Sequence, residues 1–173
     1  MKKKIGFVAA MALVGLALLS TRYYMVDLPV WHLFGGGNEP DPLTLHLRGE
    51  FVESNLGAAE GPAGSVTVRM IAQQFVFVPQ CIVVPAGVPI TFRVTSADAV
   101  HKLSFLGTDY GLEAVPGVVT ESTFTFVKAG EFKIPCREFC GAGHYAMRGQ
   151  LDVVPRDQFA SLRSGERRTC EPR

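Results

Sequence analysis

The chain contains the runs Val66-Thr-Val-Arg-Met-Ile71 and Pro89-Ile-Thr-Phe-Arg-Val-Thr95, which are short and rich in β-branched and aromatic residues. Turn residues such as Pro and Gly separate them from other runs of the same kind. These other runs are Ile82–Val84, Thr120–Phe126, Glu131–Pro135 and Gln150–Val154. Short strands at such spacing predict an all-β domain, built as an antiparallel sandwich or barrel.

Directly after the fifth run, the sequence Cys136-Arg-Glu-Phe-Cys140-Gly-Ala-Gly-His144-Tyr-Ala-Met147 places two thiols, an imidazole and a thioether in one short loop. Thiolate and thioether are soft donors that favour Cu(I), whereas imidazole also suits Cu(II). Zinc would accept the cysteines and the histidine but has little use for methionine. The donor set therefore favours copper. Gly141 and Gly143 allow the backbone of the loop a wider range of conformations than other residues would.

A second imidazole from another part of the chain would tie this loop to the body of the domain. The best candidate is His101, because the two other histidines outside the loop precede the strand-rich region. Each residue also has a purely structural interpretation. A lone histidine is often structural, Cys136 and Cys140 could form a disulfide or a redox pair, and Met147 could pack in the core.

These residues closely resemble the copper A domain of cytochrome c oxidase subunit II. The family signature Cys-x-Glu-x-Cys-x-x-x-His-x-x-Met, with a histidine upstream, is matched by Cys136, Glu138, Cys140, His144, Met147 and His101. The resemblance extends through Gln73–Gly87 and Val94–Phe105, so that residues 65–155 look like one family domain. The single hydrophobic segment at the N-terminus is similar to that of the B-type heme-copper oxidases.

The resemblance implies the cupredoxin Greek-key fold and a dinuclear copper centre in which both thiolates bridge two coppers. His101 and Met147 would complete the site of one copper, and His144 with the backbone carbonyl of Glu138 that of the other. Sharing the transferred electron between two bridged metals changes each bond little, so the reorganisation energy is low. Such a centre transfers electrons rather than transforming a substrate, and packing and hydrogen bonds around the sulfurs tune its potential.

The resemblance further implies the subunit at which electrons enter a terminal heme-copper oxidase. It would accept them from cytochrome c and pass them to heme in subunit I, where oxygen is reduced. In many relatives the carboxylate at the position of Glu138 also binds magnesium at the boundary with subunit I, and this ion prefers oxygen ligands. Phe75 and Phe77 lie where relatives carry an exposed aromatic patch for incoming electrons, and Tyr145 lies between two ligands. Ordinary core packing is the alternative for all three.

Two other functions share these features. The copper domain could be a stand-alone electron carrier for another reductase, such as one acting on nitrous oxide, although the N-terminal hydrophobic segment disfavours a freely diffusing carrier. The chain could instead deliver copper, holding one Cu(I) transiently. The chaperones that assemble this centre carry their cysteines in a thioredoxin-like α/β framework with the histidine downstream, whereas His101 precedes Cys136. A quinol-oxidase subunit II lacks the copper ligands, so the ligand set argues against it.

The N-terminus begins Met1-Lys-Lys-Lys4 and continues as an uncharged apolar run to Leu19. This pattern predicts a single-pass membrane anchor over residues 1–27, with a cleaved signal peptide as the alternative. The lysines should stay in the cytoplasm, so the copper domain would lie on the periplasmic side of the inner membrane. Residues 28–64 are expected to form a linker around a short ordered piece at Leu43–Val52, and residues 156–173 a tail.

The composition fits this organisation. With 173 residues and 47% hydrophobic content, the chain can form one core of about 100 residues plus an anchor. A net charge of +1 argues against a nucleic-acid partner. Two cysteines remain outside the loop, and in an exported protein an even number left over predicts a disulfide between Cys81 and Cys170. A buried free Cys81 beside a mobile tail is the alternative.

Overall fold

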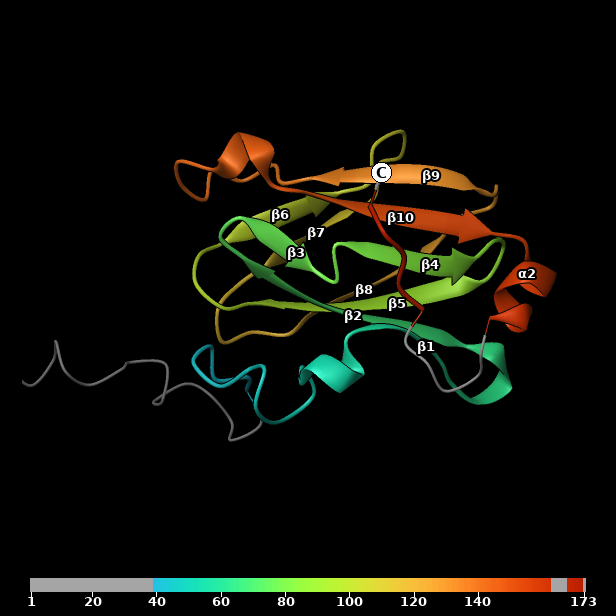
Figure 1. Cartoon of the computed structure of the whole chain (residues 1–173), viewed down its shortest axis with the longest axis horizontal. Coiled ribbons are helices and arrows are strands. Elements are labelled where there is room, and N and C mark those ends of the chain that lie inside the picture. Colours follow the sequence, from blue (N-terminus) through green and yellow to red (C-terminus); the bar gives the residue numbers. More distant parts are fainter. Residues whose placement is uncertain (1–38, 163–167, 173) are drawn as a thin grey trace, which may run out of the picture. The chain divides into compact units, whose positions relative to one another are not determined.

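Five strands form the largest sheet of the computed structural model, which describes residues 39–162 and 168–172 (Figure 1). The long strand β2 (Val66–Gln73) pairs in parallel with β5 (Pro89–Ser96) along one edge. Strand β8 (Thr120–Thr125) adds to β5 in the antiparallel direction. The short strands β1 (Gly57–Glu60) and β3 (Val76–Val78) share the other edge of β2, each pairing with one half of it.

The second sheet has three strands, and its central strand leads out of the loop that carries the thiols. This strand, β10 (Arg148–Val154), pairs in parallel with β4 (Cys81–Pro85) and antiparallel with β9 (Gly130–Pro135). A two-stranded ribbon of β6 (His101–Ser104) and β7 (Gly111–Ala114) completes the strands of the described residues. Residues 136–147 join β9 to β10, so the predicted metal loop is a hairpin loop.

All six predicted strands are present, with ends shifted by one or two residues, and the all-β prediction is confirmed. The purely antiparallel arrangement is wrong, because β2 with β5 and β4 with β10 pair in parallel. The spacing of strands in a sequence does not fix the pairing direction, which depends on how the chain crosses between the sheets. Strands β1, β3, β6 and β7 are not predicted from the sequence, since three or four residues are too few to show a pattern.

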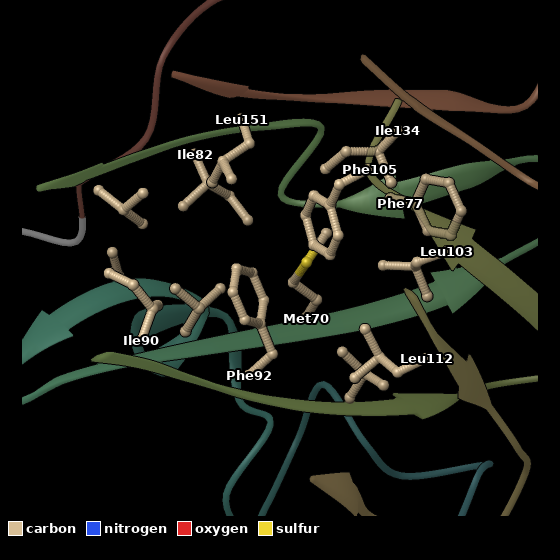
Figure 2. Close-up of a cluster of buried hydrophobic side chains, with 14 of the residues drawn as sticks. Met70, Phe77, Ile82, Ile90, Phe92, Leu103, Phe105, Leu112, Ile134 and Leu151 are labelled. Carbon is tan, nitrogen blue, oxygen red and sulfur yellow. The ribbon is translucent and has the colours of Figure 1, made fainter. Parts of the chain in front are cut away.

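Apolar side chains from both sheets meet in one core (Figure 2). Buried and more exposed positions alternate along most of β2 and β5, so that Val68, Met70, Ile90 and Phe92 all point inward. The rings of Phe92 and Phe105 lie 5.1 Å apart between centroids. Each fully buried side chain of this size contributes roughly 1.5–3 kcal/mol. The core therefore provides a stiff frame for the loops at its ends.

Residues 39–64 belong to the same compact unit as the sheets, which spans Glu39–Arg173. The apolar side chains of Leu45, Phe51 and Leu56 are buried against Ile71. Because Ile71 follows Met70 in a strand, it points to the opposite face of the sheet from the main core. This part of the chain, for which the sequence predicts a linker around a short ordered piece at Leu43–Val52, therefore forms packed structure on the outside of the largest sheet.

The predicted membrane anchor, residues 1–27, and the first part of the predicted linker lie outside the described residues. Within the part of the chain that the structure describes, no helix combines the length and the apolar character needed to cross a bilayer. The helical pieces described there are short. They are the α-helix α2 (Arg156–Ser161) and the 3₁₀ turns η2 (Glu53–Asn55), η3 (Pro62–Gly64) and η4 (His144–Ala146).

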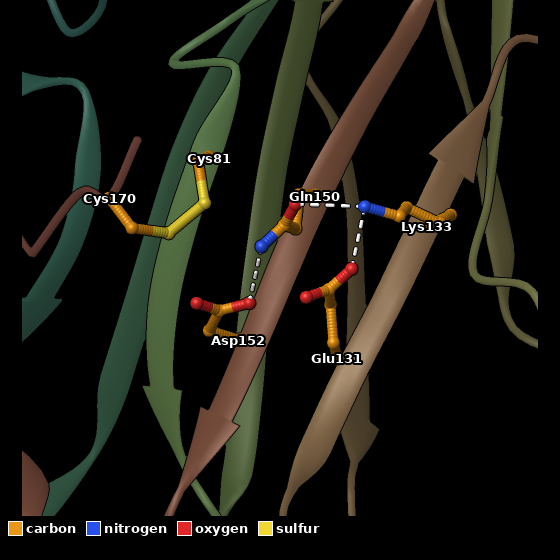
Figure 3. The surroundings of a disulfide bond; sticks show 6 residues. All are labelled: Cys81, Glu131, Lys133, Gln150, Asp152 and Cys170. Carbon is orange, nitrogen blue, oxygen red and sulfur yellow. Dashed lines mark hydrogen bonds and ion pairs between the residues drawn. A yellow bond between two sulfur atoms is a disulfide. The ribbon is translucent and has the colours of Figure 1, made fainter. Parts of the chain in front are cut away.

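A short C-terminal segment closes the gap between the edges of the two main sheets. Arg168 pairs with β1, and Thr169 pairs with β4. The backbone N–H of Cys170 donates to the carbonyl of Cys81 at 3.2 Å. A disulfide joins these two residues, which confirms the predicted bond (Figure 3). The end of the described chain is thus bound to both sheets.

The side chain of Arg168 strengthens this attachment. Its guanidinium lies 3.9 Å from the ring centroid of Phe159, a buried residue of α2. Its Nη2 also lies 3.0 Å from the carboxylate of Glu60 at the end of β1. A cation over an aromatic face is favourable, and more so when it is withdrawn from water, as here.

Replacing Cys170 with serine (Cys170→Ser) should lower the free energy of unfolding by about 2–5 kcal/mol, because the bond restricts the unfolded chain across 89 positions. Urea-induced unfolding followed by circular dichroism measures the change. A thiol reductant should shift the midpoint of the wild-type protein in the same direction and leave that of the variant unchanged. Equal midpoints for variant and wild type would contradict a stabilising role.

Glu50 joins residues 39–64, the N-terminal packed segment, to the largest sheet. Its carboxylate accepts hydrogen bonds from Arg69 Nε at 2.9 Å and from Arg93 Nη2 at 2.8 Å. Arg93 also pairs with Glu121 of β8. The hydrogen bond from Arg93, followed by the attraction of both arginine charges, lowers the pKa of Glu50 in spite of its partial burial.

Since folding lowers this pKa, the Glu50 contacts stabilise the protein above the usual glutamate value of 4.5, and the contribution is lost as the pH falls through the lowered pKa. Glu50→Gln should cost about 1 kcal/mol at neutral pH, a modest amount because water partly screens the group. It should also reduce the loss of stability on acidification. Thermal melting from neutral pH to below the usual glutamate pKa measures both effects. Glu53→Gln, at a nearby exposed position, is the control. A parallel pH dependence in Glu50→Gln and wild type would exclude the contribution.

Candidate metal centre

The loop that carries the thiols is closed at its base by strand pairing. Strands β9 and β10 run antiparallel with Pro135 opposite Arg148, and the N–H of Cys136 donates to the carbonyl of Met147 at 3.1 Å. Between these ends the chain folds back through the 3₁₀ turn that begins at His144. Cys136 and Met147 therefore face each other across the base of the hairpin loop.

Strand β6 brings the distant histidine to this loop. The N–H of Arg137 donates to the carbonyl of Lys102 at 2.8 Å, and Leu103 forms a bridge with Cys136. His101, the first residue of β6, is fully buried, and its Nδ1 lies 3.9 Å from the Sγ of Cys136. The long-range partner predicted from the sequence is therefore beside the loop.

The donor atoms of the loop lie close to one another. The sulfurs of Cys136 and Cys140 are 3.9 Å apart, and both thiols are free. The Sγ of Cys140 lies 3.7 Å from both His144 Nδ1 and Met147 Sδ. The Sγ of Cys136 lies 3.2 Å from the carbonyl oxygen of Glu138. Two donors bound to one metal at about 2.0–2.3 Å lie roughly 3.5 Å apart, so these spacings fit metal binding. The structure thus brings all six predicted ligand residues together.

Most of the donor atoms are shielded from water. His101, Cys136, Cys140 and Met147 are buried, whereas His144 is partly exposed. Burial first, and then the neighbouring Cys136, raises the pKa of Cys140 to about 11. This thiol is therefore protonated at neutral pH in the metal-free protein. A metal must displace the proton to bind, because thiolate is the ligand form.

The carboxylate of Asp98 orients His101. Its Oδ1 accepts a hydrogen bond from Nε2 of the imidazole at 2.8 Å, which leaves Nδ1 facing the thiols. Burial raises the pKa of Asp98, but hydrogen bonds from His101 and from the backbone of Gln74 and Ala99 outweigh burial and lower it. Carboxylates placed in this way fix the tautomer of metal-binding histidines. Sequence reasoning does not assign this role, and the signal for it was an acidic residue just before His101.

The aromatic residues near the loop differ in exposure. Phe77 is fully buried in the core, which contradicts its expected place in an exposed patch, because its position in β3 points inward. Phe75 is 37% exposed and Tyr145 87% exposed, so both reach the surface. Phe139, which the sequence does not single out, is 70% exposed, and its ring centroid lies 5.7 Å from that of His144. The exposed rings of Phe139 and Tyr145 therefore lie beside the partly exposed histidine.

The ring of Phe75 packs on the glycines of the loop. A Cβ added to Gly143 would lie 2.4 Å from Cδ2 of this ring, and one added to Gly141 would lie 3.1 Å from its Cε1. Gly141 also has a φ of 132°, which side chains other than glycine rarely adopt. The glycines expected to make the backbone permissive thus also leave room for Phe75.

The donor set fits copper better than zinc. His101, Cys136 and Cys140 offer ligand atoms within 4.8 Å of one another. The thioether of Met147 beside them favours a soft, redox-active metal. A second cluster, around the Cys81–Cys170 disulfide, offers no free thiol. Within the described residues, the hairpin loop is therefore the better metal site.

Comparison with known proteins relates this geometry to one family. The profile of the family described as cytochrome c oxidase subunit II, periplasmic domain, matches residues 65–154. The chain belongs to the cytochrome c oxidase subunit II family. A cytochrome c oxidase subunit 2 from Thermus thermophilus is 34% identical over 113 residues, which cover 65% of this chain and 84% of that protein.

Solved structures agree with this assignment. The periplasmic domain of subunit II of cytochrome oxidase from Bradyrhizobium japonicum has a TM-score of 0.51 at 26% identity, covering 55% of this chain and 88% of that chain. A chain of a heme-copper terminal oxidase dimer has a TM-score of 0.55 at 25% identity, covering 84% of this chain and 98% of that chain. The cupredoxin-like fold expected for a subunit II is confirmed. The described residues do not form the α/β framework of a copper chaperone.

Adding a methyl group at Gly143 (Gly143→Ala) should displace Phe75 or the loop and lower the free energy of unfolding by about 1–3 kcal/mol, as overpacking does. Gly130→Ala is the matched control, because its added Cβ would meet nothing within 4 Å and its φ is not positive. Chemical denaturation of the two variants gives the comparison. Similar small effects of both changes would show that the ring of Phe75 is not held against the loop.

Proposed function

We propose that this subunit II holds two copper ions in the hairpin loop and accepts electrons there on behalf of the oxidase. The chain is the electron-accepting subunit of a heme-copper terminal oxidase, an oxidoreductase complex. The observation that supports the dinuclear centre most is the pair of free thiols, Cys136 and Cys140, with their sulfurs 3.9 Å apart. An imidazole nitrogen lies near each sulfur, at 3.9 and 3.7 Å. Two thiolates placed in this way suit bridging positions between two soft metals.

In this proposal the thiolates of Cys136 and Cys140 would bridge both metals, and the remaining ligands would divide between them. His101 and Met147 would hold one copper, and His144 with the backbone carbonyl of Glu138 would hold the other. When bound, the copper pair supplies a one-electron carrier whose electron is shared over two metals. The protein's part is to hold the donors still, through the paired base of the loop, the attachment of β6 and the hydrogen bond that His101 donates to Asp98. A stiff ligand frame keeps the reorganisation energy of electron transfer low.

We place the electron donor, a cytochrome c or similar protein, at the surface around His144. This histidine is partly exposed, whereas His101 is buried. The rings of Phe139 and Tyr145, at centroid distances of 5.7 and 5.2 Å from the imidazole, present apolar surface beside it. Aromatic side chains are enriched in protein interfaces. The acceptor would be heme in subunit I, where oxygen is reduced.

Glu138 has a second role in this proposal, through its side chain. Its backbone carbonyl faces the sulfur of Cys136, whereas the residue as a whole is exposed. Magnesium takes oxygen ligands and commonly binds through one or two carboxylates while keeping several waters. A carboxylate at the surface beside the loop suits a magnesium site shared with subunit I.

Residues 1–27 would form a single uncleaved membrane helix. The support comes from the sequence, in which Lys2–Lys4 precede an apolar run that extends to Leu19. Retention of the lysines in the cytoplasm would place the copper domain in the periplasm, in line with the periplasmic domain that the family profile describes. The anchor would keep this domain beside subunit I in the inner membrane.

The full chain, produced with copper, should bind two coppers and give an electron paramagnetic resonance signal with hyperfine coupling to both nuclei. Cys140→Ser should abolish the shared signal, because one thiolate cannot form both bridges. Met147→Leu should retain copper and shift the reduction potential, while Met70→Leu, which changes a buried methionine of the core, should leave the potential unchanged. One copper per wild-type chain, or coupling to a single nucleus, would refute the dinuclear centre.

A further inference from the structure

The two-residue turn between β2 and β3, Gln74-Phe75, contacts the hairpin loop on one side and Asp98, the hydrogen-bond partner of His101, on the other. The strands on either side of the turn are paired, with Gln73 opposite Val76. Strand β2 in turn pairs with β5 along its length. The backbone of the turn is therefore anchored in the largest sheet, whereas four of the proposed ligand side chains belong to the hairpin loop of the other sheet.

On one side, the turn is connected to the loop. The side-chain amide of Gln74 donates a hydrogen bond from Nε2 to the carbonyl oxygen of Cys140. The ring of Phe75 packs on Gly141 and Gly143, the positions that follow. Two adjacent residues of the turn thus hold the part of the loop that runs from Cys140 toward His144.

On the other side, the same turn is connected to the distant histidine. The backbone N–H of Gln74 donates to Oδ2 of Asp98 at 2.6 Å. The other carboxylate oxygen of Asp98 accepts from Nε2 of His101 at 2.8 Å. A continuous set of hydrogen bonds therefore runs from His101 through Asp98 and Gln74 to the backbone of Cys140.

We propose that Gln74 is a positioning residue of the metal centre, which fixes the hairpin loop relative to the histidine of β6. The copper part of this inference rests on the proposed function, while the ordering of the loop does not. Hydrogen-bonded groups behind the ligands commonly change metal affinity about 10- to 100-fold. Gln74 itself is exposed, so removal of its amide does not empty any part of the core. A change there should act on the loop and the metal rather than on the fold.

Gln74→Met keeps a side chain of similar length but removes the amide donor. In the metal-free full chain, hydrogen exchange of the peptide covering residues 140–147 should become several-fold faster. In the copper-loaded full chain, two coppers should remain bound, but their release to a Cu(I) chelator should be about 10-fold faster. The hyperfine pattern and the reduction potential should also change, which a purely structural role at this exposed position would not cause.

The matched control is Gln80→Met. Gln80 is also exposed, and its amide also donates to a backbone carbonyl, that of Arg148 at 3.4 Å, just beyond the loop. In this variant the hydrogen exchange of residues 140–147, the rate of copper release and the reduction potential should all equal those of the wild type. If Gln74→Met does not fold, Gln74→Asn, which keeps the amide on a shorter side chain, should give the same faster exchange and release.

The positioning role would be overturned if hydrogen exchange of the loop, copper release and the reduction potential in the Gln74 variant all equalled those of the wild type. A wild-type chain that binds no copper pair would refute the proposed function, yet the exchange of the metal-free loop would still decide the role of Gln74. Two coppers in the wild type together with unchanged exchange in Gln74→Met would refute the positioning role alone. The two proposals therefore fail on different measurements.

Discussion

The backbone hydrogen bond from Cys136 to Met147 is the contact on which the metal centre depends. It closes the base of the hairpin loop, and the bond from Arg137 to Lys102 attaches β6 to the same point. Protein groups alone make both bonds, so the backbone positions of the ligands do not rely on bonds to metal. Many small zinc domains differ, because there the metal itself supplies much of the folding free energy.

The rest of the molecule gives this arrangement its stiffness. The shared core fixes the two sheets to each other, and the N-terminal packed segment covers the outer face of β2 near Ile71. The C-terminal segment spans the gap between β1 and β4 and is secured by the disulfide. Well-packed interiors deform little, so motion of the chain does not easily change the distances between donors. For an electron-transfer protein, such resistance to change matters more than a shaped substrate pocket.

The sequence predicted the features that local pattern determines. Six strands were visible as apolar runs, the ligand residues as a motif, and the Cys81–Cys170 bond from the cysteines left outside it. It did not predict the parallel pairing of β2 with β5, which depends on the path of the chain between sheets. It also could not assign roles to Asp98 and Gln74, since each acts on residues brought near only by folding.

The chain carries two cysteine pairs with opposite requirements. One pair is joined across 89 positions of sequence, while Cys136 and Cys140 are free although only four positions separate them. The entropic cost of closing a loop rises with its length. While the chain is still unfolded in an oxidising environment, Cys136 and Cys140 therefore meet more readily than Cys81 and Cys170. Cys170 also follows the near pair in the chain and is therefore synthesised after it. During maturation of this protein, a disulfide between Cys136 and Cys140, which would remove two proposed metal ligands, can therefore form before the Cys81–Cys170 bond.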